Sequence, residues 1–291
     1  MRFKRVAAVA AAATLALGLA ACGDSDEGAG GGGDKSFKAG STMERLYKAQ
    51  KIKVGTKFDQ PGFGQKGLSG KPEGFDVEIA KLIVKELGIP EDKIEYVETP
   101  SKVREDKIVD GSVDLVAATY TINDKRKERI AFAGPYYEAG QNIMVKKGDS
   151  SITGPDSFKA GDKKVCSVTG STPAEEIKKY VKDVASQLVL FDTYDKCRDA
   201  LKGGQVDAVT TDNVILLGYI AKDEASFQMA GDNFTKEPYG IGVKKDDTDF
   251  RNFINDTLDK AYQDGSWKKA WDDTAGKFGA TLGDAPAINR Y

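Results

Sequence analysis

The sequence has 291 residues, of which 40% are hydrophobic and 30% are charged, as expected for a folded chain of one large or two ordinary domains. A formal net charge of −2 argues against a nucleic-acid partner. The sequence contains no histidine, which excludes Ser-His-Asp and Cys-His catalysis and every histidine-ligated metal site. Three cysteines without a C-x-x-C pair also argue against structural zinc, so we expect no metal and no cofactor.

Residues 1–22 have the features of an export signal, because three basic residues precede an apolar run at 6–19. The run is short and rich in alanine for a membrane-spanning helix. It ends in Leu-Ala-Ala-Cys, which resembles a bacterial lipobox and implies that Cys22 is acylated and becomes the mature N-terminus. Lipid on Cys22 would anchor the protein to the outer face of the cell membrane. The alternative is an ordinary signal peptide with a chance cysteine.

The segment at 23–40 is acidic and then rich in glycine, which predicts a flexible tether. After it, the hydrophobic pattern predicts alternating strands and helices. The predicted strands are at 51–56, 94–97 and 113–116, and the predicted helices are at 75–87, ended by Gly88 and Pro90, and from 101. This order indicates an α/β fold with a parallel sheet.

A second unit of the same kind follows Tyr137. Its predicted strands are at 163–168, 188–191 and 206–210, and its helices begin at 172 and 194. Thr172 looks like an N-cap, with Pro173 at the first helical position and Glu175 completing a capping box, and the free N–H groups there would make an anion site. Residues 238–243 are predicted to return the chain to the first unit. The final helices carry Trp267 and Trp271, which we interpret as core residues.

The stretch from Ala117 to Arg126 follows a predicted strand and contains two hydroxyl residues, Thr119 and Thr121, before the arginine. In an open α/β sheet, ligands bind beyond the carboxyl ends of the strands. An arginine side chain offers a planar fork of donors that matches the two oxygens of a carboxylate. These residues therefore suit a carboxylate site, but taken alone they are explained slightly better by a strand followed by a solvated charged turn.

The segment G-F-D-V-E-I-A (residues 74–80) resembles the signature of the bacterial family-3 extracellular solute-binding proteins, which are polar amino-acid receptors of ATP-binding-cassette (ABC) importers. Four more motifs occur in the family's order and spacing: T-Y-T-I-N-D-K-R, F-A-G-P-Y-Y, V-T-G-S-T and V-D-A-V-T-T-D. The sequence looks most similar to the actinobacterial glutamate-binding lipoproteins. The resemblance implies a type II periplasmic-binding-protein fold with a ligand cleft between lobe 1 (41–140 plus 239–291) and lobe 2 (141–238).

The same resemblance implies roles for six residues. Arg126 matches the arginine that pairs with the ligand α-carboxylate, and Asp212 matches the carboxylate that receives the α-ammonium. The other four are Thr119 and Thr121, which match hydroxyl contacts, Thr172, which matches a carboxylate contact from the second lobe, and Ala118, where many members have serine. If the contact at Ala118 is made by the backbone carbonyl, nothing is lost by the replacement.

The choice of amino acid depends on two further cations. Lys57 stands where family members that bind basic ligands carry an aspartate, so the charge is reversed here. Ser101 and Arg104 match the Ser-x-x-Arg of members that bind acidic amino acids. Each cation alone is explained by a solvated surface charge. Together they indicate a side-chain carboxylate on the ligand and favour glutamate over aspartate or glutamine.

We therefore expect a monomeric binding lipoprotein that delivers an amino acid to an ABC permease, and not an enzyme. Relatives of the fold include dehydratases and ligand-sensing domains. A dehydratase needs a general acid near the bound carboxylate, and the nearest candidates, Glu175 and Glu176, fit better as helix-capping charges. A sensor needs a fused output or membrane segment, and the sequence stops at Tyr291.

Cys166 and Cys197 remain after Cys22 is assigned to the lipid anchor. One lies on a predicted second-lobe strand, and the other lies on the helix after the neighbouring strand. In an oxidising compartment this arrangement predicts a disulfide. The alternative is two small buried hydrophobic residues.

Overall fold

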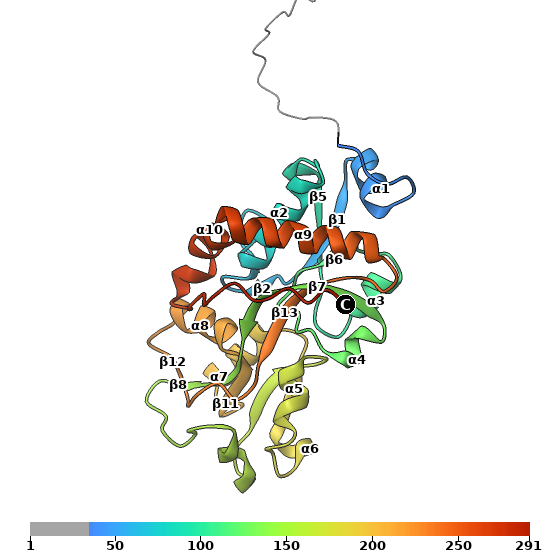
Figure 1. Cartoon of the computed structure of the whole chain (residues 1–291). Coiled ribbons are helices and arrows are strands. Elements are labelled where there is room, and N and C mark those ends of the chain that lie inside the picture. The colour runs from blue at the N-terminus through green and yellow to red at the C-terminus, as the bar shows by residue number, and fades with distance from the viewer. Residues whose placement is uncertain (1–34) are drawn as a thin grey trace, which may run out of the picture. The chain divides into compact units, whose positions relative to one another are not determined.

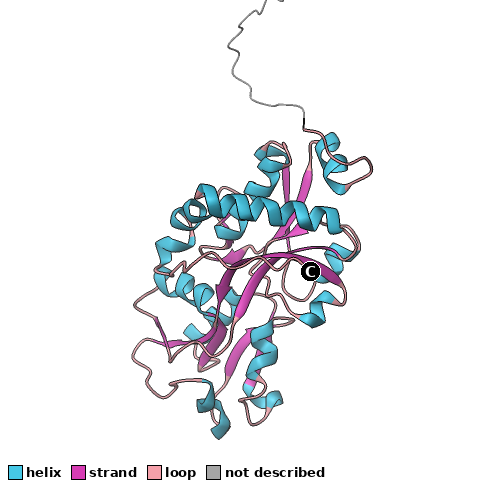
Figure 2. Cartoon of the chain, viewed as in Figure 1, coloured by secondary structure: helices cyan, strands magenta, loops and turns pink. Residues whose placement is uncertain are grey.

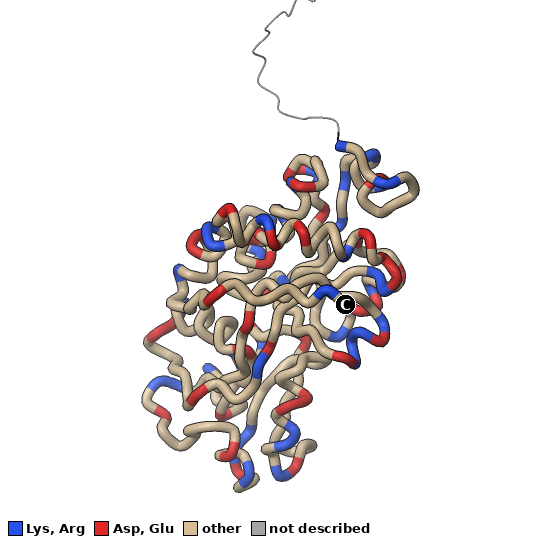
Figure 3. The backbone as a smooth tube through the Cα atoms, in the orientation of Figure 1, with Lys and Arg blue, Asp and Glu red and all other residues tan. Residues whose placement is uncertain are grey.

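A computed structural model of the chain describes residues 35–291 (Figure 1). The predicted signal peptide, the lipidated Cys22 and most of the tether lie outside these residues. In the part of the chain that the structure describes, no helix is long and apolar enough to cross a membrane. Lysine and arginine are interspersed with aspartate and glutamate along the backbone, as the balanced composition predicts (Figure 3).

The first sheet has five strands in the order β5-β1-β6-β13-β7. The strands are β1 (Ile52–Thr56), β5 (Ile94–Glu98), β6 (Leu115–Val116), β7 (Ile130–Ala139) and β13 (Glu237–Lys244). Strand β1 pairs in parallel with β5 and β6, whereas β13 is antiparallel to β6 and β7. The predicted strand at 113–116 is shorter than expected, because the Val113 N–H donates to Lys107 O at the end of the preceding helix.

Helices cover this sheet, with α2, α9 and α10 grouped on one side of it (Figure 1). They are α1 (Thr42–Ala49), α2 (Phe75–Glu86), α3 (Arg104–Val109), α4 (Asp124–Lys127), α9 (Thr248–Asp264) and α10 (Ser266–Asp273). Trp267 and Trp271 of α10 are buried, and the Trp271 ring stacks on Tyr137 at 4.7 Å. Their interpretation as core is confirmed. A small sheet of β2 (Asp59–Gln60), β3 (Gly64–Lys66) and β4 (Pro72–Glu73) precedes α2.

The helix α2 begins after Gly74, which has a φ of +136°. A Cβ at this position would lie 2.3 Å from the carbonyl carbon of Phe63. Real side chains do not approach backbone atoms so closely, and L-residues rarely adopt this φ. The glycine of the G-F-D motif is therefore required by the close approach of the loop before β3.

The second sheet also has five strands, in the order β10-β9-β11-β8-β12. The strands are β8 (Gln141–Lys146), β9 (Val165–Val168), β10 (Leu188–Phe191), β11 (Ala208–Asp212) and β12 (Phe227–Met229), and the helices are α5 (Thr172–Ile177), α6 (Val184–Gln187), α7 (Tyr194–Lys202) and α8 (Asn213–Lys222). Strands β9, β10 and β11 are parallel, as predicted, while β8 and β12 add antiparallel pairings. Short 3-10 helices occur at η1 (Glu91–Lys93), η2 (Pro155–Ala160) and η3 (Ala275–Phe278).

Two long antiparallel strands connect the sheets. Strand β7 ends at Ala139 and the chain continues into β8 of the second sheet after one residue, Gly140. Strand β13 returns from the second sheet and pairs with β7 from Glu237 to Lys244. These strands cross the middle of the molecule (Figure 2). The architecture is a two-lobe α/β fold of the type II periplasmic-binding-protein kind, as predicted.

The start of α5 differs from the prediction. Ser171 is the N-cap, and its Oγ accepts a hydrogen bond of 3.0 Å from the Ala174 N–H. Thr172 is the first helical residue, so the predicted Thr172 cap and the capping box with Glu175 are wrong. The hydroxyl one residue earlier already satisfies the third amide of the helix. The Thr172 hydroxyl is consequently free to point into the cleft.

A disulfide joins Cys166 of β9 to Cys197 of α7, with a Cα–Cα distance of 5.5 Å. It links the centre of the second sheet to the helix that covers it. On the loop-entropy account, closing a loop of this length stabilises the folded state by restricting the unfolded chain.

Replacing both cysteines by serine should therefore lower the free energy of unfolding by about 3 kcal/mol, measured by urea denaturation of the mature protein. Reducing agent should destabilise the wild type by a similar amount and leave the double variant unchanged. Two titratable thiols in the denatured, unreduced wild type would contradict the disulfide.

Candidate ligand-binding site

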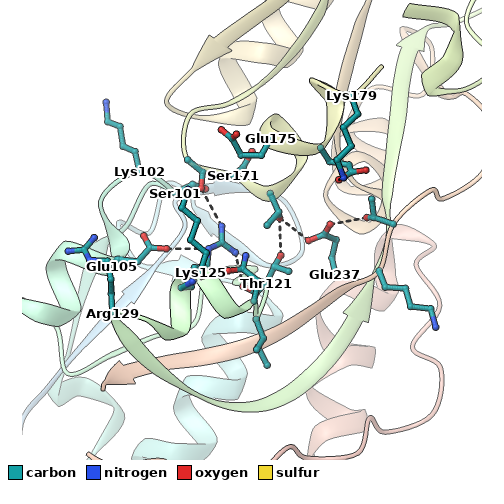
Figure 4. A pocket seen from close by; sticks show the side chains of 18 residues that line it. Ser101, Lys102, Glu105, Thr121, Lys125, Arg129, Ser171, Glu175, Lys179 and Glu237 are labelled. Atoms are coloured by element: carbon teal, nitrogen blue, oxygen red, sulfur yellow. Dashed lines mark hydrogen bonds and ion pairs between the residues drawn. The ribbon is translucent and has the colours of Figure 1, made fainter. Parts of the chain in front are cut away.

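A cleft of about 620 Å³ lies between the two lobes. Its first-lobe wall comes from α3, α4 and the loop between β6 and α4, and its second-lobe wall comes from the start of α5 (Figure 4). The start of β13 closes one side. The polar lining residues that matter most below are Ser101, Glu105, Thr121, Arg126, Thr172 and Glu237.

The predicted site residues lie at the carboxyl ends of parallel strands, where an open α/β sheet binds ligands. Lys57 follows β1, Thr119 and Thr121 follow β6, Thr172 follows β9, and Asp212 ends β11. Ser101, Thr121, Arg126 and Thr172 line the cleft directly. The other five predicted residues, Lys57, Arg104, Ala118, Thr119 and Asp212, are buried and do not belong to the cleft lining.

Arg126 is held by both lobes. Its helix α4 is capped by Asn123, whose Oδ1 accepts from the Arg126 N–H at 2.9 Å. The guanidinium donates from Nη1 to Thr121 O at 2.6 Å and from Nη2 to Gly170 O at 3.3 Å, and its Nε lies 3.2 Å from Glu105 Oε1. Burial, together with the charge of a neighbouring arginine, lowers the pKa of Arg126 to about 10. The guanidinium is therefore fixed in orientation and mostly dehydrated.

Two hydroxyls meet across the cleft. Thr121 Oγ1 of the first lobe lies 3.2 Å from Thr172 Oγ1 of the second, and Thr172 Oγ1 donates to Glu237 Oε2 at 2.8 Å (Figure 4). The backbone of Thr121 also forms an antiparallel bridge with Tyr239 of β13. The predicted carboxylate contacts Thr121, Arg126 and Thr172 are thus brought together by the structure.

Lys57 and Arg104 form a second buried basic group. Lys57 Nζ donates to Ser101 Oγ at 2.8 Å. Arg104 Nη1 donates to Ala118 O at 2.8 Å, and its guanidinium carbon lies 3.8 Å from the centre of the Tyr120 ring. Burial and then the positive charge of Arg104 lower the pKa of Lys57 to about 7. Ser101 therefore contacts Lys57, whereas Arg104 contacts Ala118 and Tyr120, and the prediction that Lys57 and Arg104 hold a ligand carboxylate stays a prediction.

Asp212 is also buried. Its Oδ2 accepts a hydrogen bond of 2.6 Å from the Tyr239 hydroxyl, while Oδ1 has no hydrogen-bond partner among residues 35–291. Burial and then the negative charge of Glu237 raise the pKa of Asp212 to about 8. One oxygen of this carboxylate is therefore available to a hydrogen-bond donor.

The role of Asp76 was not predicted from the sequence, where this residue is only part of the G-F-D motif. Thr119 has a φ of +45°, in the left-handed region, and its N–H donates to Asp76 Oδ2 at 2.8 Å. Asp76 Oδ1 accepts from the Tyr136 hydroxyl at 2.5 Å. Burial raises the pKa of Asp76 to about 7, and the two donors act in the opposite direction. A carboxylate between the apolar residues Phe75 and Val77 was the signal in the sequence.

Two acidic residues of the cleft were also missed. The prediction that Glu175 and Glu176 are the acids nearest the carboxylate-binding groups is wrong, because they form ion pairs along α5 with the lysines three residues later. The acids that contact these groups are Glu105, beside Arg126, and Glu237, beside Thr172. Their roles depend on the packing of α3 and β13, which single-sequence patterns do not reveal.

The loop that carries Lys57 also contacts the second lobe. Asp59 Oδ2 accepts a hydrogen bond of 2.8 Å from the N–H of Tyr194, the first residue of α7. The Tyr219 hydroxyl of α8 donates to Asp59 O at 2.7 Å. The first-lobe loop thus supplies acceptors to two second-lobe helices.

Residues 52–273 match the sequence profile of the bacterial extracellular solute-binding proteins, family 3. The chain belongs to this family. It is 39% identical over 277 residues to the glutamate-binding protein GluB of Corynebacterium efficiens, covering 92% of this chain and 89% of the relative. It is 38% identical to the ABC transporter glutamine-binding protein GlnH of Bacillus subtilis, covering 87% and 90%. An ancestral arginine-binding protein bound to glutamine superimposes with a TM-score of 0.71 at 36% identity, covering 77% of this chain and 97% of that one.

In this family-3 protein, Asp76→Ala should leave the Thr119 N–H and the Tyr136 hydroxyl without an acceptor. Each buried donor left unpaired costs about 1–3 kcal/mol of folding free energy. Urea denaturation at about pH 4, near the ordinary pKa of an aspartate, is the appropriate measurement, because Asp76 is then protonated in the folded protein and about half protonated in the unfolded protein, and its raised pKa contributes little to the difference. Glu78→Ala, in the same helical turn, is the control, and it should cost only about 0.3–0.5 kcal/mol. Equal losses in both variants would contradict this role of Asp76.

Proposed function

We propose that the protein captures glutamate outside the cytoplasm and delivers it to an ABC importer. The observation that carries the proposal is that three buried cations, Lys57, Arg104 and Arg126, belong to the first lobe, while the carboxylate of Asp212 belongs to the second lobe. Glutamate carries two carboxylates and one ammonium, and these charges match the arrangement. The relatives named as glutamate-binding and glutamine-binding proteins support the same class of ligand.

In this proposal each end of the ligand has its own contacts. The α-carboxylate binds Arg126 and the hydroxyls of Thr121 and Thr172, since a guanidinium fork and hydroxyl donors suit two carboxylate oxygens. The α-ammonium binds the free oxygen of Asp212 and shares Ala118 O. The Ala118 carbonyl already accepts hydrogen bonds from Arg104 and from the Thr119 hydroxyl. To make room for the ammonium, the Thr119 hydroxyl must donate to Gln60 Oε1 instead, which lies 3.0 Å away.

The distal carboxylate binds Lys57 and Arg104. The hydrogen-bond acceptors of these two cations, the Ser101 hydroxyl and the Ala118 carbonyl, are both neutral. A buried charge without an opposite partner is costly, so a ligand carboxylate would offset part of that cost. Glutamine would fill the same space without supplying the charge, and aspartate would be one methylene too short to reach both ends.

The anchor, the location and the state of assembly belong to the same proposal. Cys22 carries lipid that holds a monomeric protein at the outer face of the membrane, beside its permease. Lobe 1 is formed by 41–140 and 239–291, and lobe 2 by 141–238.

Cys22→Ser should abolish labelling by radioactive palmitate and release the protein from the membrane fraction. Unchanged labelling of that variant would contradict the anchor.

The proposed role is binding without turnover. Titration calorimetry of the mature protein with glutamate, glutamine, aspartate and arginine is the direct test, with glutamate expected to bind most tightly. Incubation with glutamate should return it unchanged. Failure to bind any amino acid would overturn the proposal.

Lys57→Met and Arg104→Met should each weaken glutamate binding selectively. A lost charge-assisted contact to a buried carboxylate costs about 2–5 kcal/mol. This corresponds to a loss of affinity of roughly thirty- to several thousand-fold. Glutamine should lose much less, so the ratio of the two affinities should narrow, whereas Arg126→Ala should weaken both ligands together.

Lys102→Met is the matched control for these variants. Lys102 lines the mouth of the cleft but is exposed and paired with Asp192 at 2.7 Å, so it should leave the ratio unchanged. If Lys57→Met and Arg104→Met weaken both ligands equally, or neither, the side-chain pocket is misplaced and the assignment of glutamate fails.

The preference for glutamate should also depend on pH. The pKa of Lys57 in the free protein is about 7, so its charged fraction falls as the pH rises above 7. Because a bound carboxylate favours charged Lys57, glutamate affinity should fall by up to about tenfold per pH unit above 7. Glutamine has no side-chain carboxylate, so its affinity should not depend on the charge of Lys57. The titration of Asp212 affects both ligands alike and cancels in their ratio.

Calorimetry at pH 6.5, 7.5 and 8.5 measures this effect as a decline in the ratio of glutamate to glutamine affinity. In Lys57→Met the pH dependence of the ratio should become much smaller, and what is left should come from Asp76, which also titrates near pH 7 and whose charge acts on Arg104. A constant ratio in the wild type would show that Lys57 does not hold the distal carboxylate.

A further inference from the structure

We propose that Glu237 is a second carboxylate of the α-ammonium subsite and makes the cleft select amino acids over 2-oxo acids of the same shape. This inference rests on the proposed function, because it concerns the same ligand. It adds a residue outside the motifs that carry the family resemblance.

The first support is the position of Glu237. It is the first residue of β13 and is only 4% exposed, yet it lines the cleft with Thr121, Arg126 and Thr172 (Figure 4). Alternate residues of a strand face the same side, so Glu237 and Tyr239 share a face of β13. The Tyr239 hydroxyl holds Asp212, which places the two carboxylates along one edge of the site.

The second support is the direction of the hydrogen bonds around Glu237. Its Oε1 accepts from the Thr235 hydroxyl at 2.8 Å, and its Oε2 accepts from the Thr172 hydroxyl at 2.8 Å. A threonine hydroxyl has a single proton to donate. Thr121 must therefore donate to Thr172, and the chain of donors runs from the first lobe through the second lobe to Glu237.

The third support is charge. Within residues 35–291, Glu237 forms no ion pair at 4.0 Å or less, and its hydrogen-bond partners are neutral hydroxyls. The charges of Glu237 and Arg126 act on each other, but the ion pair of Arg126 is with Glu105. A buried carboxylate without a directly paired cation is costly, as is the unpartnered Oδ1 of Asp212. The mutual repulsion of the two acids also raises the pKa of Asp212. A cation placed between them would offset both costs.

A primary ammonium fits this demand. It has three N–H donors, and the proposal assigns it three acceptors, which are Asp212 Oδ1, Glu237 and Ala118 O. A 2-oxo acid has the same carboxylates but carries an uncharged carbonyl oxygen in place of the ammonium. It would bring lone pairs against two carboxylates, and the site should reject it.

The test compares glutamate with 2-oxoglutarate by titration calorimetry at pH 7.5. Wild type should prefer glutamate strongly. Glu237→Gln keeps the shape and removes the charge; its oxygen can still accept from one hydroxyl, while its NH2 group must donate to the other. Glutamate affinity should therefore fall about tenfold or more, and 2-oxoglutarate affinity should stay equal or rise. The acid limb of the glutamate affinity profile should also move to lower pH, because Asp212 loses its anionic neighbour.

Two further variants separate the effect of the Glu237 charge from that of its position and shape. Glu175→Gln makes the same chemical change at the cleft wall, where the acid is exposed and paired with Lys178, and it should leave the preference unchanged. Glu237→Asp keeps the charge and should retain the preference within about threefold. Urea denaturation of each variant shows whether it is folded. If Glu237→Gln does not fold, Glu237→Asp becomes the test. Loss of the preference for glutamate over 2-oxoglutarate in Glu237→Asp would then overturn the proposal.

The outcomes are distinct. If Glu237→Gln weakens glutamate and 2-oxoglutarate equally, or behaves like Glu175→Gln, Glu237 is structural and the inference is overturned. If the wild type binds glutamine and not glutamate, the comparison is made with glutamine and its 2-oxo analogue, with the same expected result. If the wild type binds no amino acid, the proposed function itself fails.

Discussion

The hydrogen bond from the Thr119 N–H to the Asp76 carboxylate is the interaction on which the site depends most. A non-glycine residue in the left-handed region costs about 1–2 kcal/mol, and a charge-assisted hydrogen bond is strong enough to offset that cost. The turn at Thr119 sends the chain from β6 to the bridge between Thr121 and Tyr239, and from there to α4 and Arg126. The G-F-D motif of α2 and the loop from Thr119 to Arg126 are consequently one structural unit.

The buried charges around the cleft are arranged unevenly. Arg126 has Glu105 beside it, whereas the hydrogen-bond partners of Lys57 and Arg104 are a hydroxyl and a carbonyl. On the acidic side, Glu237 is held by two hydroxyls. Each imbalance raises the free energy of the free protein, and each would be relieved by an opposite charge. In the proposed function, these partly satisfied groups are the source of a preference for a zwitterion with an extra carboxylate.

What could be predicted from the sequence follows a physical division. The order of strands and helices was predictable because the spacing of apolar residues is a local signal, and so are Gly88 and Pro90, which end a helix. The cap of α5 was misplaced by one residue, since Ser171 and Thr172 are adjacent hydroxyls and only the backbone path decides which one reaches Ala174. Glu237 was missed because its neighbours Thr172 and Thr121 are distant in sequence and meet it only after β13 pairs with β7.

The loop after β1 connects recognition of the ligand to contact between the lobes. Lys57 faces Ser101 within the first lobe, and two residues later Asp59 accepts hydrogen bonds from α7 and α8 of the second. The approach is so close that a Cβ on Gly218 of α8 would lie 2.5 Å from Pro61 O. Lys57 and Asp59 are two residues apart, so one short backbone segment sets both the position of the Lys57 side chain and the hydrogen bonds to the second lobe.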